Sequence, residues 1–161
     1  MLSRRVVALV VIVVSIALSA MVFMVYYYTP AGNTLFFVYG DAFCPHCERF
    51  AEFLRDNHYN YYFCNLESSK TCSISYINIT NELGLPQAVP LTIVVKNNRI
   101  IAIIIGEVED KGFLEQLAKQ NPSEEIPVYY STNLVGHINI PDTIQKQIIS
   151  NIIKLSEHKN G

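Results

Sequence analysis

The sequence predicts a mixed α/β domain, a sheet flanked by helices, preceded by one N-terminal transmembrane helix. Three observations predict this architecture: apolar strand runs alternate with helical patterns, two later runs form a hairpin, and the chain begins with a long uncharged segment. A strand-helix-strand order implies a parallel pair joined by a right-handed crossover, and a hairpin adds antiparallel strands. At 161 residues, the chain has room for one domain besides the N-terminal segment.

The N-terminal segment spans residues 6–28 (VVALVVIVVSIALSAMVFMVYYY) and contains no charged side chain. A helix of this length is about 34 Å long, enough to cross the hydrocarbon core of a bilayer. The run is longer than the apolar part of a cleaved signal peptide, and it ends in three tyrosines instead of a small-x-small cleavage site. We therefore expect residues 1–28 to be a signal anchor. Cleavage near Ser19 or Ala20, which would release a secreted domain, is the alternative.

The charges that precede this segment predict its orientation. Arg4 and Arg5 precede it, so the positive-inside rule places the N-terminus in the cytoplasm and the C-terminal domain outside the cytoplasm. Cysteines in that compartment can stay oxidised. Residues 29–33 form a short linker. Without the two arginines, 10 of the 12 basic side chains remain against 14 acidic ones, which argues against a nucleic-acid-binding role.

A domain over residues 34–120 follows the linker. Residues 35–39 are an aromatic and β-branched run that ends at Gly40-Asp41, which predicts a buried strand and a turn. After the first two cysteines, apolar residues recur at helical spacing, which predicts an amphipathic helix whose first turn holds these cysteines. The elements expected next are a strand at 61–66, a loop at 67–70 with Cys72 on its far side, and a weakly amphipathic helix at 75–83 closed by Gly84.

A hairpin and a helix complete this domain. Residues 91–95 and 99–105 are apolar runs separated by Asn97-Asn98, a pair that favours positive φ and a tight turn. Asp110 is a suitable N-cap for the following helix, which ends before Pro122.

Residues 121–161 form a C-terminal extension, in which we expect a short strand at 126–130 and a helix from about 141 to 155. Gln145 is expected largely off the apolar face of this helix. The residues expected on that face are Ile144, Ile148, Ile149, Ile152, Ile153 and Leu155. We expect the face to pack onto the domain. A helix that binds a partner or lies on a membrane surface is the alternative.

The first two cysteines lie in the stretch GDAFCPHCERF, residues 40–50. Cysteines three residues apart at the start of a helix lie one turn from each other, so they can form a disulfide with little backbone movement. The N–H groups of the first turn and the positive end of the helix dipole stabilise a thiolate, which is the species that attacks a disulfide. This favours Cys44 as the nucleophile and leaves the more buried Cys47 to resolve the mixed disulfide.

The two residues between these cysteines are expected to tune them. Pro45 suits the first helical turn because it has no N–H to leave unpaired. His46 places an imidazole beside the sulfurs, and its cationic form favours the reduced thiolate. Because stabilising the reduced form makes the disulfide a better oxidant, these residues tilt the expected chemistry toward disulfide formation.

The stretch FFVYGDAFCPHCERF, followed 42 residues after Cys47 by Val89-Pro90 at the start of a strand, resembles the thioredoxin superfamily over about residues 33–119. The resemblance implies a thioredoxin-like fold in which Pro90 is a cis proline against the cysteine pair and Val89 binds substrate through its backbone. The Cys-Pro-His-Cys pair is similar to that of Dsb-type periplasmic oxidants. The compact order of elements is more like that of thioredoxin or glutaredoxin.

The chain departs from this family pattern in two places. Members often bury an acid six residues before the first cysteine, where this chain has Val38, so proton transfer at Cys47 must use another group or water. Asp41 is expected to be a turn residue. Phe43 stands where a tryptophan often precedes the pair. We expect Phe43 to shield the sulfurs and contact substrate, with a plain core role as the alternative.

The second pair of cysteines, Cys64 and Cys72, leaves alternatives open. Together with Cys44 and Cys47 they could supply four thiolates to a structural zinc ion, but zinc sites usually show a second closely spaced pair. We favour a redox domain without a metal, in which Cys64 and Cys72 close a polar loop as a stabilising disulfide. A second redox pair that relays electrons to or from the first is the alternative.

These patterns predict a membrane-anchored, extracytoplasmic thiol:disulfide oxidoreductase. We expect it to exchange disulfides with cysteine-containing client proteins through Cys44 and Cys47, with no cofactor and with a separate redox-recharging partner. Membrane contact is expected through residues 6–28. The alternative is a non-catalytic thioredoxin-like binding module or a zinc-stabilised adaptor.

Overall fold

The computed structural model describes Ser15, Ser19 and residues 34–157. The chain divides into two units, residues 1–32 and residues 33–161. The expected signal anchor and linker fall on residues outside the described ranges, apart from the two serines, so their structure is not described. Within the described residues, no helix has both the length and the apolar character that a membrane span requires.

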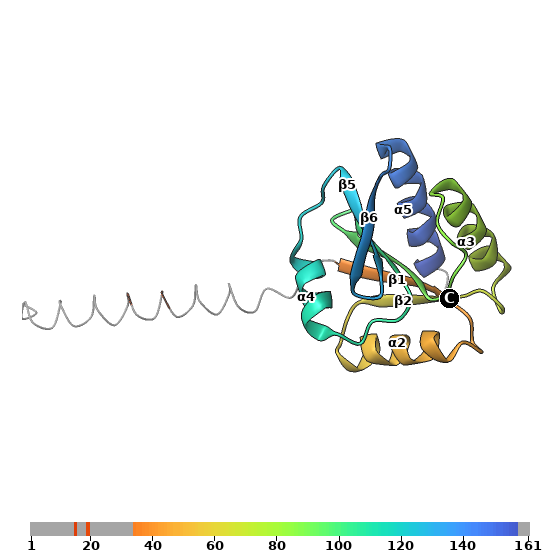
Figure 1. Ribbon diagram of the computed structural model, residues 1–161, viewed down its shortest axis with the longest axis horizontal. Coiled ribbons are helices and arrows are strands. Elements are labelled where there is room, and N and C mark those ends of the chain that lie inside the picture. Colours follow the sequence, from red (N-terminus) through yellow and green to blue (C-terminus); the bar gives the residue numbers. More distant parts are fainter. Residues whose placement is uncertain (1–14, 16–18, 20–33, 158–161) are drawn as a thin grey trace, which may run out of the picture. The chain divides into compact units, whose positions relative to one another are not determined.

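A six-stranded mixed sheet forms the centre of the second unit, with strand order β2-β1-β3-β4-β5-β6 (Figure 1). The strands are β1 (Thr34–Gly40), β2 (Tyr61–Asn65), β3 (Leu91–Lys96), β4 (Arg99–Ile105), β5 (Glu125–Tyr130) and β6 (Asn133–Asn139). Strand β1 pairs parallel with β2 and antiparallel with β3, and β3 pairs antiparallel with β4. This arrangement confirms the mixed α/β class predicted for the domain.

Helices cover both faces of the sheet (Figure 1). They are α2 (Pro45–Asp56) and α4 (Lys111–Lys119) on one face, and α3 (Lys70–Glu82) and α5 (Asp142–Glu157) on the other. Successive side chains of β1 supply both layers: Phe36 and Val38 pack with the α2 and α4 side, and Phe37 and Tyr39 pack with the α3 and α5 side. Since both faces are buried, the central strands have nearly continuous apolar sequences.

Three locally encoded features take the predicted form. Asn97 and Asn98 have φ values of 49° and 61°, so the hairpin between β3 and β4 turns as expected. Gly84 follows α3 with a φ of 62°, as a C-terminal glycine should. Asp110 is the N-cap of α4, and its carboxylate accepts the Phe113 N–H at 3.0 Å.

Helix α3 begins earlier than its sequence pattern predicts. It starts at Lys70 because Ser69 is its N-cap and accepts the Cys72 N–H at 3.2 Å. The expected loop at 67–70 is therefore shorter, and Cys72 lies inside the first turn of the helix. The weak amphipathic pattern of α3 hid this start, since both Ile74 and Ile77 remain exposed on its surface.

The C-terminal residues extend the sheet by two strands. β5 pairs parallel with β4, and β6 pairs antiparallel with β5 at the edge of the sheet. β5 was expected from the sequence, whereas β6 was not. Leu134 and Val135 are adjacent apolar residues and both are exposed, so this edge strand lacks the alternation that marks a half-buried strand.

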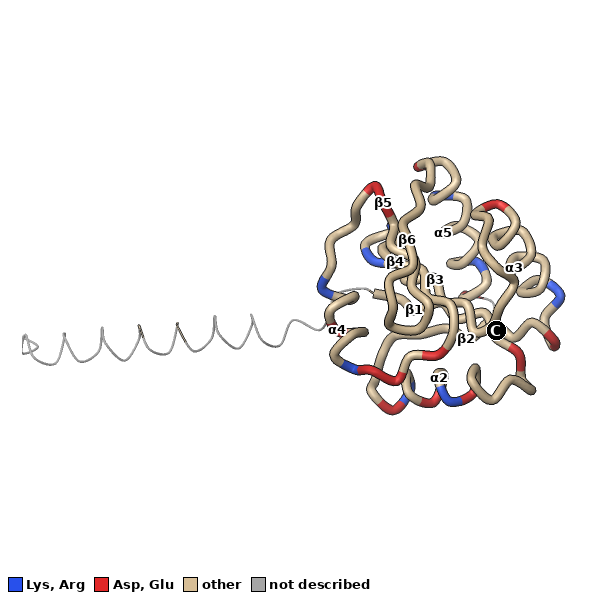
Figure 2. The backbone as a smooth tube through the Cα atoms, viewed as in Figure 1, with Lys and Arg blue, Asp and Glu red and all other residues tan. Residues whose placement is uncertain are grey.

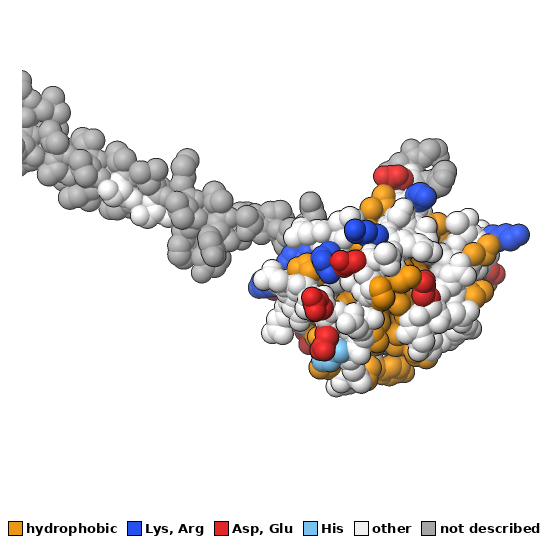
Figure 3. Space-filling view, turned by 90° about the horizontal axis from the view of Figure 1, so that it is seen from above, with side chains coloured by type: hydrophobic (Ala, Val, Ile, Leu, Met, Phe, Trp, Pro, Cys, Tyr) orange, Lys and Arg blue, Asp and Glu red, His pale blue; other side chains and the backbone are white. Residues whose placement is uncertain are grey.

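Helix α5 packs on the sheet with a face that differs in part from the expected one. Ile148, Ile149 and Ile152 are buried, whereas Ile153 is 41% exposed. Figure 3 looks onto the face where α3 and α5 lie and shows exposed apolar side chains scattered among polar ones. Gln145, expected off the apolar face, is only 4% exposed. Its amide nitrogen donates to the Ile140 carbonyl at 3.2 Å, and its oxygen accepts the Ile100 N–H at 3.4 Å.

Replacing Gln145 by alanine should lower the free energy of unfolding by about 1 kcal/mol, because two buried backbone groups lose a hydrogen-bond partner. The magnitude is modest since both bonds are long. Gln147→Ala is the matched control: Gln147 lies on the same helix but is exposed, and its loss should change stability by about 0.5 kcal/mol or less. Urea denaturation of the two variants measures the difference. Equal losses would contradict the role given to Gln145.

Candidate redox site

The sulfur of Cys44 caps helix α2. Cys44 is the N-cap residue, Pro45 occupies the first turn, and the Cys47 N–H donates to the Cys44 sulfur at 3.2 Å. The Cys44 carbonyl also accepts the N–H groups of Cys47 and Glu48, at 3.0 and 3.1 Å. The sulfur thus stands where a serine or aspartate oxygen usually caps a helix, a position that favours negative charge.

The two thiols of the pair differ in their surroundings. Both are free; Cys44 is partly exposed and Cys47 is buried. Burial, helped by the hydrogen bond with Cys44, raises the pKa of the Cys47 thiol to about 12, and a backbone hydrogen bond from Asp41 opposes this shift. At neutral pH, Cys47 is therefore a protonated thiol behind a reachable sulfur.

This difference predicts which thiol an alkylating reagent modifies. In the folded, reduced protein at pH 7, Cys44 should react and Cys47 should not, because the thiolate is the reactive species and the Cys47 thiol is buried with a pKa of about 12. Modification of Cys47 should rise only far into the alkaline range. Mass spectrometry of the labelled peptides over a pH series measures this.

The control for this experiment is Cys44→Ala. Since the hydrogen bond and charge of Cys44 both raise the pKa of Cys47, this variant should shift Cys47 labelling to lower pH. Equal labelling of the two cysteines at pH 7 would contradict the assignment.

The segment Val89-Pro90 lies at the same edge of the sheet as the cysteines. Tyr39, near the end of β1, pairs with Leu91 at the start of β3. Pro90 precedes Leu91, so it lies beside the loop that follows β1 and carries Cys44. The peptide bond between Val89 and Pro90 is cis. Pro90 is buried, and Val89 is half-buried against the core. The resemblance to thioredoxins implied this peptide geometry, and the sheet register brings Pro90 to the edge that carries the pair.

Neighbouring groups hold this edge together. The Gly106 N–H donates to the Pro90 carbonyl at 2.8 Å, and the Tyr76 hydroxyl donates to the Ala88 carbonyl at 3.2 Å. Burial raises the pKa of Tyr76, with a smaller contribution from the charge of Cys47, so the phenol and the buried sulfur are within electrostatic range. Gly40 allows close packing here, because a Cβ at this position would lie 3.2 Å from the Cys47 Cβ and 2.5 Å from the Phe63 ring.

Three further residues flank the pair. Phe43 is 82% exposed, so the alternative that gave it a plain core role is wrong; the ring is turned to solvent beside Cys44. The Asp41 carboxylate accepts the Phe43 N–H at 2.9 Å, as expected of a turn residue. Val38 is fully buried in the apolar cluster beneath α2, so this position supplies no proton-transfer group.

Cys64 and Cys72 are bonded to each other. Their Cα atoms are 5.6 Å apart, both residues are buried, and the bond ties β2 to the first turn of α3. The two sulfurs are therefore not free thiolates, which contradicts the four-thiolate zinc alternative. In the described part of the chain, no group of three or more His, Cys, Asp or Glu side chains gathers as a metal site would require.

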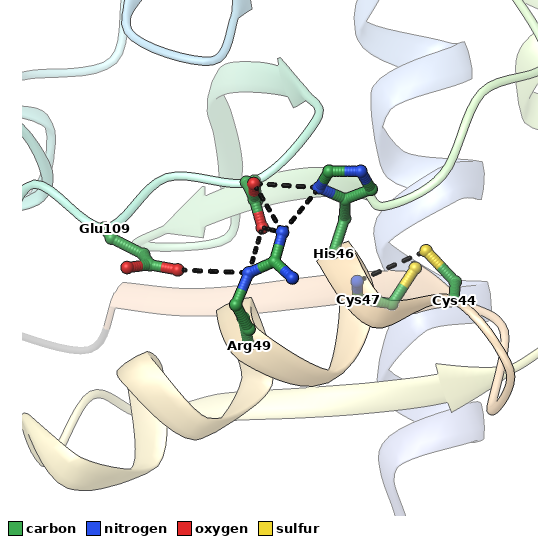
Figure 4. Close-up of polar contacts among 6 residues, drawn as sticks. Cys44, His46, Cys47, Arg49 and Glu109 are labelled. Atoms are coloured by element: carbon green, nitrogen blue, oxygen red, sulfur yellow. Dashed lines mark hydrogen bonds and ion pairs between the residues drawn. The ribbon is translucent and has the colours of Figure 1, made fainter.

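A charged cluster beside His46 was not predicted from the sequence (Figure 4). The His46 Nδ1 lies 2.8 Å from Glu107 Oε1 and 2.8 Å from Arg49 Nη2. Arg49 also donates to both oxygens of Glu107, at 3.1 and 2.9 Å, and lies 3.6 Å from Glu109. The hydrogen bond from Arg49 is the main cause of the lowered pKa of Glu107.

The position of Glu107 directly after a strand could have indicated that it lies near the cysteine pair. β1 and β4 both pair antiparallel with β3, so they run in the same direction and end at the same edge of the sheet. Residues just after each strand therefore meet, and Glu107 follows β4 as the cysteine loop follows β1. Figure 2 shows acidic and basic positions interleaved along α2 and acidic positions in the loop that leads to α4.

Comparison with known proteins finds similarity to a solved structure. No model of a known protein family matches the chain, and no curated protein matches it. The crystal structure of a glutaredoxin from Archaeoglobus fulgidus is similar, with 22% sequence identity and a TM-score of 0.38. The similarity covers 58% of this chain and 94% of the glutaredoxin.

Proposed function

We propose that this chain is a membrane-anchored, extracytoplasmic thiol:disulfide oxidoreductase that acts on cysteine-containing client proteins. The observation that carries the proposal is the asymmetry of the pair: the Cys44 sulfur is partly exposed and caps a helix, and Cys47 lies buried behind it. The edge that carries Val89 and Pro90, and the exposed ring of Phe43, would offer a client chain a surface beside the reacting sulfur.

Disulfide transfer through this pair takes two exchange steps. A client thiolate attacks Cys44 Sγ of the Cys44–Cys47 disulfide, a client–Cys44 disulfide forms, and Cys47 leaves as a thiolate that takes up a proton. A second client thiolate then attacks the client sulfur of this mixed disulfide, which releases Cys44 as a thiolate and leaves the client oxidised. The pair gains two electrons in the cycle, so a recharging partner must accept them.

The proposal leans toward disulfide formation for an electrostatic reason. A thiolate at the N-cap of α2 is stabilised by the Cys47 N–H and by the positive end of the helix, and whatever stabilises the reduced pair makes its disulfide a stronger oxidant.

The test of direction uses the purified full-length chain in two assays. An oxidase should accelerate refolding of a reduced, denatured disulfide protein, and a reductase should accelerate reduction of insulin by dithiothreitol. We expect the first signal to be the larger. Loss of both signals, with a client still bound, would instead support a non-catalytic binding module.

The compartment and anchor need a separate experiment in cells. A membrane-impermeant maleimide should label Cys44 of the reduced protein without lysis, and the protein should stay with membranes during alkaline carbonate extraction. Labelling only after lysis would place the domain in the cytoplasm, and release by carbonate would argue against an anchor. Either outcome leaves the exchange chemistry itself intact.

A further inference from the structure

A histidine and an arginine near Cys44 share one carboxylate. His46 and Arg49 lie two and five residues after Cys44 on α2, and Glu107 engages both. Figure 4 shows His46 and Arg49 joined by dashed lines to one unlabelled carboxylate, which the hydrogen bonds identify as that of Glu107. The Nδ1 atom of His46, which was expected to tune the sulfurs, lies 2.8 Å from Glu107.

Glu107 reaches this cluster from outside α2. The preceding Gly106 has a φ of 90°, a conformation that favours glycine, and its N–H donates to the Pro90 carbonyl at 2.8 Å. The loop that carries Glu107 is thus fixed to the same sheet edge as the cysteine pair. Glu107 is about a quarter exposed, at 28%, whereas Arg49 and His46 are more open to solvent.

The hydrogen bonds at His46 hold the imidazole in place in either of its protonation states. A protonated Nδ1 can donate only to Glu107, and an unprotonated Nδ1 can accept only from Arg49. Both partners lie on the same side of the ring, and Arg49 keeps its own hydrogen bonds to Glu107 in either state. Glu107 therefore holds the ring when Nδ1 carries a proton, and Arg49 holds it when Nδ1 does not.

A positive charge near Cys44 stabilises the thiolate, and a negative charge destabilises it. Arg49 is within electrostatic range of Cys44, since the Cys44 charge contributes to the raised pKa of the guanidinium, behind the larger effects of Glu107 and Glu109. The same interaction acts on Cys44 in return. Glu107 offsets this stabilisation of the thiolate. Its negative charge lies next to the positive charge of Arg49 and at hydrogen-bond distance from His46.

We infer that Glu107 is a positioning residue that restrains the oxidising strength of the Cys44–Cys47 pair by engaging Arg49 and His46. The inference rests on the proposed function and specifies how this chain sets its redox equilibrium. The ionisable groups involved are those of Cys44, His46, Arg49, Glu107 and Glu109.

The test equilibrates the full-length protein with glutathione. Two glutathione thiols give two electrons and two protons to the Cys44–Cys47 disulfide, and leave as one molecule of glutathione disulfide. Glu107→Gln removes the negative charge, so the equilibrium constant for reduction should rise about two- to fivefold, a range suited to partly exposed charges. Arg49→Gln removes the positive charge and leaves Glu107 in place, so the constant should fall. The two opposite shifts should shrink in high salt.

The matched control is the ion pair of Glu52 and Arg55, which lies 3.5 Å apart further along α2. Glu52→Gln and Arg55→Gln should leave the equilibrium with glutathione unchanged. Urea denaturation of every variant separates a loss of stability from a change of redox equilibrium. A merely structural role of Glu107 would alter stability alone.

Each outcome decides the inference. An unchanged or lower constant in Glu107→Gln, or shifts of the same sign in Glu107→Gln and Arg49→Gln, overturns the role of Glu107 and leaves the proposed function intact. A wild-type pair that forms no disulfide at any glutathione ratio overturns the proposed function, and this inference with it.

Discussion

Replacing Cys44 by serine should abolish disulfide exchange, whereas replacing Cys47 by serine should trap mixed disulfides between Cys44 and client proteins. The reason is the order of the two sulfurs: Cys44 is the reachable one, and Cys47 is buried one turn behind it. A serine hydroxyl at position 44 cannot attack a disulfide, so turnover should drop to the uncatalysed rate. With serine at position 47 the internal disulfide cannot form, but the Cys44 thiolate can still attack a client disulfide. The sulfur that would then break the resulting mixed disulfide is missing, so this species should accumulate.

Non-reducing electrophoresis of cells that express each variant measures the trapped species. Complexes that disappear on reduction should be abundant with Cys47→Ser and absent from the double variant that also carries Cys44→Ser. Equal residual turnover in the two single variants, or trapped complexes that persist without Cys44, would contradict the assignment. The double variant is the necessary control because Cys64 and Cys72 are further possible sites of capture once their bond is reduced.

Removing the bond between Cys64 and Cys72 by a double alanine substitution should lower the free energy of unfolding by about 2.5 kcal/mol. The bond closes a loop with a sequence separation of 8, and the chain-entropy estimate for a loop of that size gives this magnitude. The bond joins β2 to α3, and α3 supplies Tyr76 to the edge of the sheet that holds Ala88. Urea denaturation of the wild-type and double-alanine proteins measures the loss.

The same variant separates a structural disulfide from a redox relay. Both sulfurs are buried in the core, so we expect exchange through Cys44 and Cys47 to persist at a temperature where the variant is folded. Cys64→Ser with Cys72→Ser is the second variant, which keeps a polar atom at each site. Loss of client oxidation in the cell, with glutathione-driven exchange intact in the purified variants, would instead support a relay to the recharging partner.

The parts of the fold that follow from local chemistry were predictable from the sequence. Asn97-Asn98, Asp110 and Gly84 act through their own backbone or their own side chain, so their turns and caps depend little on distant residues. The strands of the central sheet were also predictable, because burial on both faces leaves an apolar run that is visible in one dimension. Ser69 was missed only because the helix it caps has exposed isoleucines.

The candidate site also has one part that the local sequence predicts and one part that it does not. The spacing of Cys44 and Cys47 at the start of a helix is a local pattern, so the reachable sulfur and the buried one could be told apart in advance. The environment of His46 is not local. Glu107 lies 61 residues further along the chain, and the pairing of β1, β3 and β4 is what brings it to α2.

The amino-acid order was thus sufficient for the cysteine motif, the Asn97-Asn98 turn, the caps at Asp110 and Gly84 and the buried strands, since each is visible within a few residues. Sheet pairing was needed to reveal the edge strand β6, the buried role of Gln145 and the carboxylate that holds His46 and Arg49. Such features depend on which distant segments share a surface. A side chain such as Glu107 or Gln145 carries the same polarity in the sequence whether its partner is water or another part of the protein.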